Sequence, residues 1–165
     1  MLKKLWVKQF RNLNEVSISF ESNKPVFIYG YNNQGKTNIL ESLYYLGNGK
    51  SPSGTPLEDL IQFRQDSMYL GLDYHSQEDG NQRIYIKGSH KFGLQMMLNN
   101  DVVKQASKIQ KMVPISYLSS SISRVYMEVP DARRRDLDSF LSVYFPEYLY
   151  QIKSLALLYT LCFFE

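Results

Sequence analysis

Residues 30–37 read Gly-Tyr-Asn-Asn-Gln-Gly-Lys-Thr, which fits G-x-x-x-x-G-K-[ST], the pattern of a phosphate-binding P-loop. In such a loop, successive backbone N–H groups surround phosphate oxygens, and the following helix adds the positive end of its dipole. Gly35 leaves room for close approach, Lys36 reaches the outer phosphates, and the Thr37 hydroxyl takes one position on Mg²⁺. The candidate phosphate-binding residues are Gly30, Tyr31, Asn32, Asn33, Gln34, Gly35, Lys36 and Thr37.

The sequence on both sides of the loop favours the strand and helix that this motif requires. Val26-Phe27-Ile28-Tyr29 is a short apolar and aromatic run between Pro25 and Gly30, which predicts a central strand buried on both faces. From Thr37 onward, apolar residues recur at helical spacing until Gly47-Asn48-Gly49, which is typical of a helix C-cap. This context turns a short pattern into a prediction of a real nucleotide site.

The rest of the chain predicts a mixed α/β fold. Alternating apolar and polar residues in 2–10 and 16–20 predict a hairpin that turns around residues 12–14. The middle of the chain is rich in predicted strands, with a helix on either side. The further strands are expected at 68–74, 83–87, 92–98 and 113–118, and the helices at 57–63 and from Pro130 through Leu141 and Tyr144.

Composition sets wide limits on class and partners. The 165 residues are 44% hydrophobic and 21% charged, which fits a globular protein and excludes a disordered or collagen-like chain. A net charge of +3 is too small to indicate a nucleic-acid partner by itself. Cys162 is the single cysteine, and His75 and His90 lack companions at metal-ligand spacing, so a reducing, cytoplasmic compartment is expected.

Neither end of the sequence predicts a membrane protein. The first ten residues contain lysines with no apolar run behind them, unlike a signal peptide. The apolar run at 155–164 is far shorter than the ~20 residues that span a bilayer.

An apparatus for hydrolysis is not identifiable in the sequence. ATP cleavage in P-loop enzymes requires an apolar strand that ends in a Mg²⁺-binding carboxylate. The best candidate is Leu70-Gly71-Leu72-Asp73, which glycine interrupts, and Asn23-Lys24-Pro25 does not complete a guanine-reading motif. We therefore assign no catalytic residue and expect nucleotide binding with weak or no ATPase activity.

Three segments together resemble the RecF family of bacterial DNA replication and repair proteins, which are relatives of the SMC-type ATPases with an ABC-like head. The first is Phe10-Arg11-Asn12-Leu13, the second runs from Asn32 through the P-loop to Leu46, and the third is Pro130-Asp131-Ala132-Arg133-Arg134-Arg135-Asp136-Leu137-Asp138. The third is similar to the family's Pro-x-x-Arg-Arg-Arg-Phe-Leu-Asp. Three matches in the right order are more specific than a P-loop alone.

The resemblance implies a P-loop NTPase of ABC/SMC-head type that binds ATP, Mg²⁺ and single-stranded or gapped DNA. It implies work in recombinational repair, replication and SOS induction with other recombination mediator proteins. It covers less than half of a typical family member. The implied organisation is an ATP-binding lobe at 1–125 and the start of a helical lid at 126–165. The ABC signature and the Mg²⁺-site carboxylates would lie downstream, so this chain alone should not form the ATP-dependent homodimer.

The chain departs from the family pattern at several positions. Asn33 stands where glycine is usual, and asparagine tolerates the left-handed backbone better than most residues. Asp136 replaces the usual phenylalanine, residues 49–55 lack basic character, and 152–165 do not continue the expected basic helix. These last residues suggest a truncated or frameshifted end.

The three arginines, Arg11 and the chain as a whole each allow a second interpretation. Arg133, Arg134 and Arg135 could contact DNA or nucleotide, or form a solvated helix face, since three successive helical residues point in three directions. Arg11 could approach the nucleotide, as the resemblance suggests, or be a surface residue. The alternatives for the whole chain are a small P-loop kinase or phosphotransferase, which the hairpin before the P-loop disfavours, and a remnant without function.

Overall fold

The computed structural model describes residues 1–21 and 24–118 and scattered positions in the C-terminal part. Those positions are Pro130, Arg134, Leu137, Asp138, Leu141, Phe145, Glu147 and Tyr148. The chain divides into two compact units, Met1–Tyr117 and Leu118–Glu165. The boundary predicted after residue 125 lies outside the described residues, as do Arg133, Arg135, Asp136 and the tail at 152–165.

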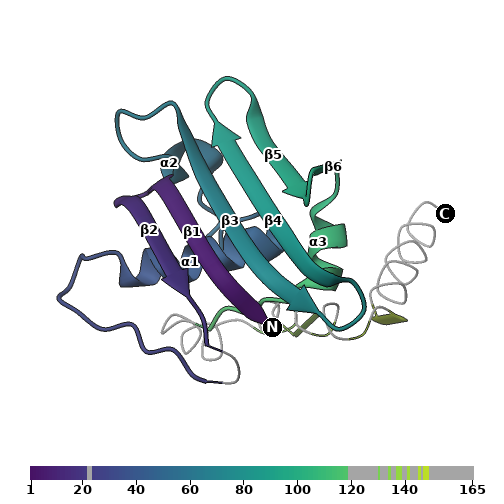
Figure 1. The fold of residues 1–165 in the computed structure, drawn as a ribbon. Coiled ribbons are helices and arrows are strands. Elements are labelled where there is room, and N and C mark those ends of the chain that lie inside the picture. The colour runs from purple at the N-terminus through teal and green to yellow at the C-terminus, as the bar shows by residue number, and fades with distance from the viewer. Residues whose placement is uncertain are drawn as a thin grey trace. The chain divides into compact units, whose positions relative to one another are not determined.

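The first unit is built on one six-stranded antiparallel sheet with the order β2-β1-β3-β4-β5-β6. Figure 1 shows the sheet from its open face. The strands are β1 (Leu2–Phe10), β2 (Leu13–Ser19), β3 (Ser67–Ser76), β4 (Gly80–Ser89), β5 (Gly93–Leu98) and β6 (Asp101–Val103). The predicted hairpin and the three following strands are confirmed, whereas the short β6 has no prediction.

Alternation along each strand separates a buried face from an open one. In β1, Leu5 and Val7 are buried while Lys4 and Lys8 are exposed, as the period of two requires. The same alternation places Met68, Leu70 and Leu72 of β3 on the buried face. One face of the sheet therefore carries the core.

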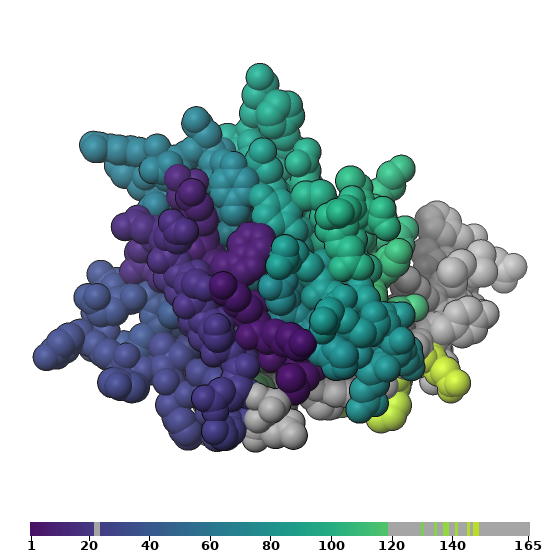
Figure 2. Space-filling model, in the orientation of Figure 1, coloured from purple at the N-terminus to yellow at the C-terminus, as the bar shows by residue number. Residues whose placement is uncertain are grey.

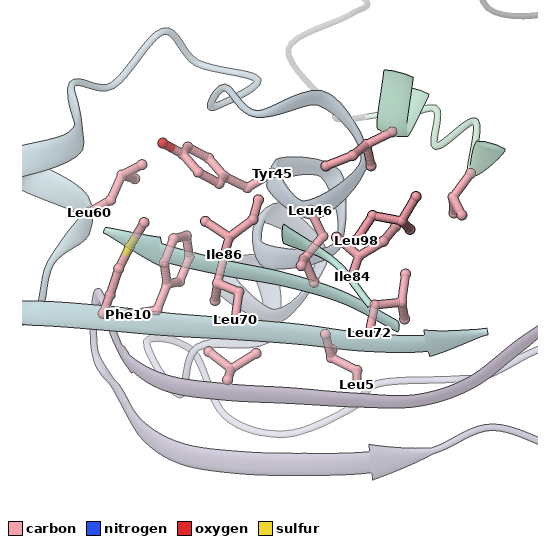
Figure 3. Close-up of a cluster of buried hydrophobic side chains, with 14 of the residues drawn as sticks. Leu5, Phe10, Tyr45, Leu46, Leu60, Leu70, Leu72, Ile84, Ile86 and Leu98 are labelled. Carbon is pink, nitrogen blue, oxygen red and sulfur yellow. The ribbon is translucent and has the colours of Figure 1, made fainter. Parts of the chain in front are cut away.

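Helices cover this buried face (Figure 1). They are α1 (Lys36–Asn48), α2 (Leu57–Leu60) and α3 (Ala106–Met112). Tyr45 and Leu46 of α1 and Ile109 of α3 join the strand side chains in a single apolar cluster, which Figure 3 shows in close-up. Burial of this apolar surface is the main stabilising term of the unit, and it fixes α1 against the sheet.

Two predictions about helices are confirmed and one element was missed. Helix α1 ends at Asn48, and the Gly49 amide donates to the Tyr45 carbonyl oxygen at 2.8 Å. The helix predicted at 57–63 is shorter, since Ile61 forms a β-bridge with Phe10. Helix α3 has no counterpart in the sequence prediction.

The predicted central strand at 26–29 is wrong. The structure assigns no strand to 24–30, and Val26, Phe27 and Tyr29 are 49%, 82% and 92% exposed. A strand buried on both faces needs paired neighbours, but both edges of β1 are already occupied by β2 and β3. Within the described residues, this apolar run pairs with no strand.

The strand predicted at 113–118 is also wrong. Val113 follows α3, and residues 114–118 have no regular structure. Here the backbone pairs with a side chain instead: Asn48 Nδ2 donates to the Ile115 carbonyl oxygen at 3.1 Å. Apolar residues in this segment pack as anchors against α1, which periodicity alone cannot distinguish from a strand.

In the second unit, Pro130, Arg134, Leu137, Asp138 and Leu141 are all helical, in agreement with the helix predicted to begin at Pro130. The Tyr148 hydroxyl donates to Asp138 Oδ1 at 2.6 Å. Among the helices that the structure describes, none combines the length and the apolar character needed to cross a membrane.

Candidate functional site

The P-loop turns sharply before it enters α1. Asn33 (φ 64°) and Gly35 (φ 90°) both have left-handed backbone, and Gly35 is the N-cap of the helix. The first helical hydrogen bond runs from the Ile39 amide to the Gly35 carbonyl oxygen at 3.0 Å. The first turn carries no acidic side chain. The free N–H groups and dipole of α1 are thus available to an anion.

Lys36 lies across the loop that precedes it. Its Nζ donates to the carbonyl oxygens of Gly30 at 2.9 Å and Tyr31 at 2.6 Å. An ammonium has three donors, so these bonds leave one for a further acceptor. The positive charge is therefore held at the mouth of the loop, and the Thr37 side chain beside it is exposed.

The hairpin turn between β1 and β2 is joined to the P-loop through Asn12. Asn12 Nδ2 donates to the Asn33 carbonyl oxygen at 3.0 Å, and Asn38 Nδ2 donates to Asn12 Oδ1 at 2.8 Å. One amide side chain therefore connects the left-handed residue of the loop with the first turn of α1. Such a bridge fixes the loop in place with few alternative conformations.

Gly35 is required by packing as well as by backbone angle. A Cβ atom at this position would lie 2.5 Å from Leu13 Cδ2 and 2.8 Å from Asn12 Oδ1. Any side chain would thus push the hairpin turn away from the P-loop. The glycine predicted to make room for phosphate also makes room for the turn.

Behind the loop, Arg11 forms a bidentate ion pair with Glu41 of α1. Arg11 Nε and Nη2 donate to Glu41 Oε2 and Oε1 at 2.6 and 2.7 Å, and the two side chains are only 27% and 6% exposed. Arg11 Nη2 also donates to Thr55 Oγ1 at 3.0 Å, and Ser51 Oγ donates to Glu41 Oε1 at 2.7 Å. This charged network links the hairpin turn, α1 and the loop at 51–55.

The backbone on either side of Phe10 is strained where it forms this junction. Gln9 (φ 58°) and Arg11 (φ 51°) are left-handed, while Phe10 between them is fully buried. The Arg11 amide donates to the Leu60 carbonyl oxygen at 2.7 Å. Non-glycine residues adopt this conformation only where surrounding contacts hold them, and such positions cluster at functional sites.

A cavity of about 550 Å³ opens beside the P-loop. It is bounded by the hairpin turn, the start of α1 and the segment from α2 to residue 65. Its lining residues are Arg11, Asn12, Asn33, Asn38, Glu58, Asp59, Ile61, Gln62, Phe63, Arg64, Gln65 and His90. The volume is within the range of small-molecule sites, and the lining mixes arginines, carboxylates, amides, a phenyl ring, an imidazole and one aliphatic side chain.

Residues 30–37 form one loop that leads into α1, and Arg11 lines the cavity beside it. The Arg11 guanidinium is bound to Glu41 and Thr55 at one side of the cavity. Arg134 is exposed on a helix of the second unit, which is described by itself.

The sequence prediction assigned no function to Asn12, Asn38 or Glu41. All three stand in segments that carry the family resemblance, which was the available signal. The hydrogen bonds Asn12–Asn33, Asn12–Asn38 and Arg11–Glu41 join residues 21 to 30 positions apart, which local patterns cannot reveal.

Asp73, which ends the best sequence candidate for a Mg²⁺-binding strand, is paired with Arg83. Arg83 Nε and Nη2 donate to its carboxylate at 2.5 and 3.0 Å, on the open face of the sheet. These hydrogen bonds and the attraction of the carboxylate raise the pKa of the Arg83 guanidinium. In the part of the chain that the structure describes, no cluster of three histidine, cysteine or acidic residues could hold a metal ion.

Comparison with known proteins agrees with this geometry. Residues 1–155 match the family described as AAA ATPase domain. A DNA replication and repair protein RecF from Thermoanaerobacter sp. (strain X514) is 33% identical over 92% of this chain and 41% of its own length.

Solved structures of RecF and SMC proteins are also similar to this chain. A structure described as the recombination mediator protein RecF-ATP in the RecFOR pathway has a TM-score of 0.80 and 26% identity, covering 92% of this chain and 40% of that one. An SMC ATPase structure shares the fold, with a TM-score of 0.67 and 20% identity over 84% of this chain and 98% of that one. The chain spans about two fifths of the length of the RecF relatives that it matches. The P-loop, the ABC/SMC-head type of fold and these similarities lead to one conclusion: the chain belongs to the AAA ATPase domain family and resembles RecF proteins.

Proposed function

We propose that this chain binds ATP with its triphosphate at residues 30–37. The observation that carries the proposal is the paired arrangement of the Lys36 ammonium over the loop and the uncompensated N-terminus of α1. The ammonium carries a positive charge, the helix N-terminus carries a partial positive charge, and both lie at the same turn of backbone. A chain of phosphates is the ligand that satisfies them together.

The cofactor that completes this site is Mg²⁺, which Thr37 would hold through its hydroxyl. The exposed side chain at the start of α1 fits this role, since an uncharged oxygen next to bound phosphates is a common Mg²⁺ ligand. The nucleoside would occupy the adjoining cavity. Asn12, Asn38 and Arg11 line that cavity and offer polar groups to a ribose or base.

We expect this chain alone to turn over ATP weakly or not at all. The carboxylate nearest to a Walker B pattern in the sequence, Asp73, is occupied by Arg83. Completion of the hydrolytic site would fall to residues beyond the matched two fifths of the relatives and to a second subunit. The ATP-dependent homodimer is accordingly proposed for the longer protein.

The process that this binding serves is proposed to be recombinational DNA repair. Membership of a RecF-like ATPase family in DNA replication and repair supports it. Within that process, we propose that the protein binds single-stranded or gapped DNA, takes part in SOS induction, contacts other recombination mediator proteins and is cytoplasmic. Residues 133–135 are candidates for DNA or nucleotide contact.

A calorimetric titration of the full chain with ATP and Mg²⁺ tests the nucleotide site. Lys36→Ala should weaken ATP binding at least about tenfold, because it removes the charge that meets the outer phosphates. It should weaken ADP binding less. Lys50→Ala, which removes an exposed lysine just after α1, is the matched control and should bind as the unchanged chain does.

The metal ligand is tested in the same experiment. Thr37→Val keeps the shape of the side chain but removes the hydroxyl, so the gain in affinity from added Mg²⁺ should disappear while metal-free binding persists. Failure of the unchanged chain to bind ATP would overturn the proposal. Transfer of phosphate from ATP to a small metabolite would favour a phosphotransferase instead.

A further inference from the structure

The open face of the sheet carries an aromatic group that the nucleotide site does not use. Trp6 of β1, Tyr69 of β3 and Tyr85 of β4 point away from the apolar core, on the alternate positions of their strands. The rings of Trp6 and Tyr85 are 5.5 Å apart between centroids, and those of Tyr69 and Tyr85 are 6.3 Å apart. We call these three rings the aromatic platform.

Gly71 makes the platform continuous across the sheet. It pairs with Trp6 on one side and Tyr85 on the other, and a Cβ atom there would lie 2.0 Å from the indole. The indole therefore lies over the backbone of β3 and reaches toward Tyr85. Any other residue at this position would displace it and separate the rings.

Cations surround the platform on the same face. Lys4 and Lys8 flank Trp6 along β1, and Lys87 follows Tyr85 along β4 with its Nζ 5.6 Å from the centre of the Tyr69 ring. Arg83 lies on the same face, where it pairs with Asp73. Glu15 of β2 is the second carboxylate on this face. The outward-facing side chains of β1 to β4 thus include four cations and two carboxylates. Figure 2 shows this face, with β1 in purple and β3 and β4 in teal.

We propose that this face binds single-stranded nucleic acid, with bases stacked on the aromatic platform and phosphates at Lys4, Lys8 and Lys87. Stacking on aromatic side chains is open to unpaired bases but not to those inside a duplex, and lysines at the edge meet the backbone charge. A protein partner fits less well, since lysine is depleted at the centres of protein interfaces. The inference deepens the proposed repair function by giving its DNA strand a location.

Trp6 reports directly on this site because it is the only tryptophan in the chain. The full chain is titrated with an oligothymidylate of about 20 nucleotides, and tryptophan emission is followed. Stacking should quench the emission and protect Trp6 from acrylamide. Tyr85→Leu, with its fold checked by circular dichroism, should weaken binding roughly tenfold, as expected for one lost stacking contact.

Charge is tested separately through the dependence of binding on salt. The double variant Lys8→Ala with Lys87→Ala should reduce the slope of log K against log salt by about 1.4, since each phosphate contact to a single strand contributes about 0.7. The matched control is Lys108→Ala with Lys111→Ala, which removes two exposed lysines from α3 on the covered side of the sheet. This control should bind with unchanged affinity and slope.

Three results would overturn the inference. They are an absence of oligonucleotide binding, binding that leaves the Trp6 emission and its quenching unchanged, and an equal loss in the α3 control. Self-association that buries Trp6 without any affinity for the oligonucleotide would assign the face to a protein contact. The Lys36-dependent ATP titration on the same sample keeps this outcome separate from a failure of the nucleotide site.

Discussion

Asn33 shows how a single residue can keep a loop geometry that glycine usually provides. Its φ of 64° lies in the left-handed region, which asparagine tolerates better than other non-glycine residues. Its carbonyl oxygen is held by Asn12 Nδ2 at 3.0 Å. The departure from the family pattern at this position therefore does not prevent the left-handed turn of the P-loop.

Gly35 is the residue at which substitution should do the most local damage. In Gly35→Ala the new Cβ would meet Leu13 and Asn12 and would also sit at a φ of 90°. We expect a loss of roughly 2 kcal/mol in the free energy of unfolding, measured by urea denaturation, together with at least tenfold weaker ATP binding.

Gly80→Ala is the matched control for that substitution. Gly80 also has a positive φ (71°), but no atom lies within 4 Å of a Cβ built there. The Gly80→Ala variant should therefore lose only the free energy of unfolding that the strained backbone costs, with its ATP affinity preserved. An equal loss of ATP affinity in both variants would contradict the role of hairpin packing in shaping the loop.

At the scale of elements, the P-loop is supported by parts that are distant in the chain. The hairpin turn meets it through Asn12, and the Arg11–Glu41 pair ties the same turn to α1. The segment after α2 completes the junction through the Arg11 amide and the Leu60 carbonyl oxygen. The nucleotide site is thus a property of three elements, of which the motif names only one.

Removing the charge of Glu41 should loosen this junction. Glu41→Gln keeps the size of the side chain but leaves the largely buried Arg11 guanidinium without its counter-charge. We expect the free energy of unfolding to fall by about 2 kcal/mol in urea denaturation, because an unpaired buried charge is costly. ATP affinity should fall as well, and Glu41→Asp should restore part of both.

Asp73→Asn provides the comparison for a charged pair outside the junction. Arg83 is 59% exposed at its side chain, so its pair with Asp73 is screened by water. Loss of this pair should cost less than about 1 kcal/mol and leave ATP binding unchanged. Equal destabilisation by the two substitutions would show that the junction has no special role.

The elements that the sequence predicted well are those whose pattern is local. The hairpin, β3 to β5 and α1 follow from alternation or helical spacing, and the P-loop follows from a spaced motif. The segment at 26–29 was misjudged because its hydrophobicity indicates burial, while burial depends on pairing that the described residues do not supply. Asn12 and Glu41 escaped notice because their partners lie far away in sequence.

At the scale of the whole first unit, alkaline pH should weaken the fold through Tyr45. Burial, and then the charge of Glu58, raises the pKa of this phenol from 10.0 to about 12. The folded state thus favours the neutral phenol, so its contribution is complete below pH 10 and is lost as pH rises from 10 to about 12. In urea denaturation across this range, Tyr45→Phe should show a flatter loss of stability than the unchanged chain. A parallel loss in both proteins would contradict this role.

The pairing of β1 with β3 has a consequence for the order of events during synthesis. The first strand of the chain lies between β2, which follows it at once, and β3, which lies beyond the P-loop and α1. The hairpin of β1 and β2 can form early, but the other edge of β1 stays unpaired until the ribosome has released residues 67–76. Non-local pairings of this kind slow folding. A nascent chain should therefore acquire nucleotide affinity only after β3 has emerged, long after the P-loop itself has left the exit tunnel.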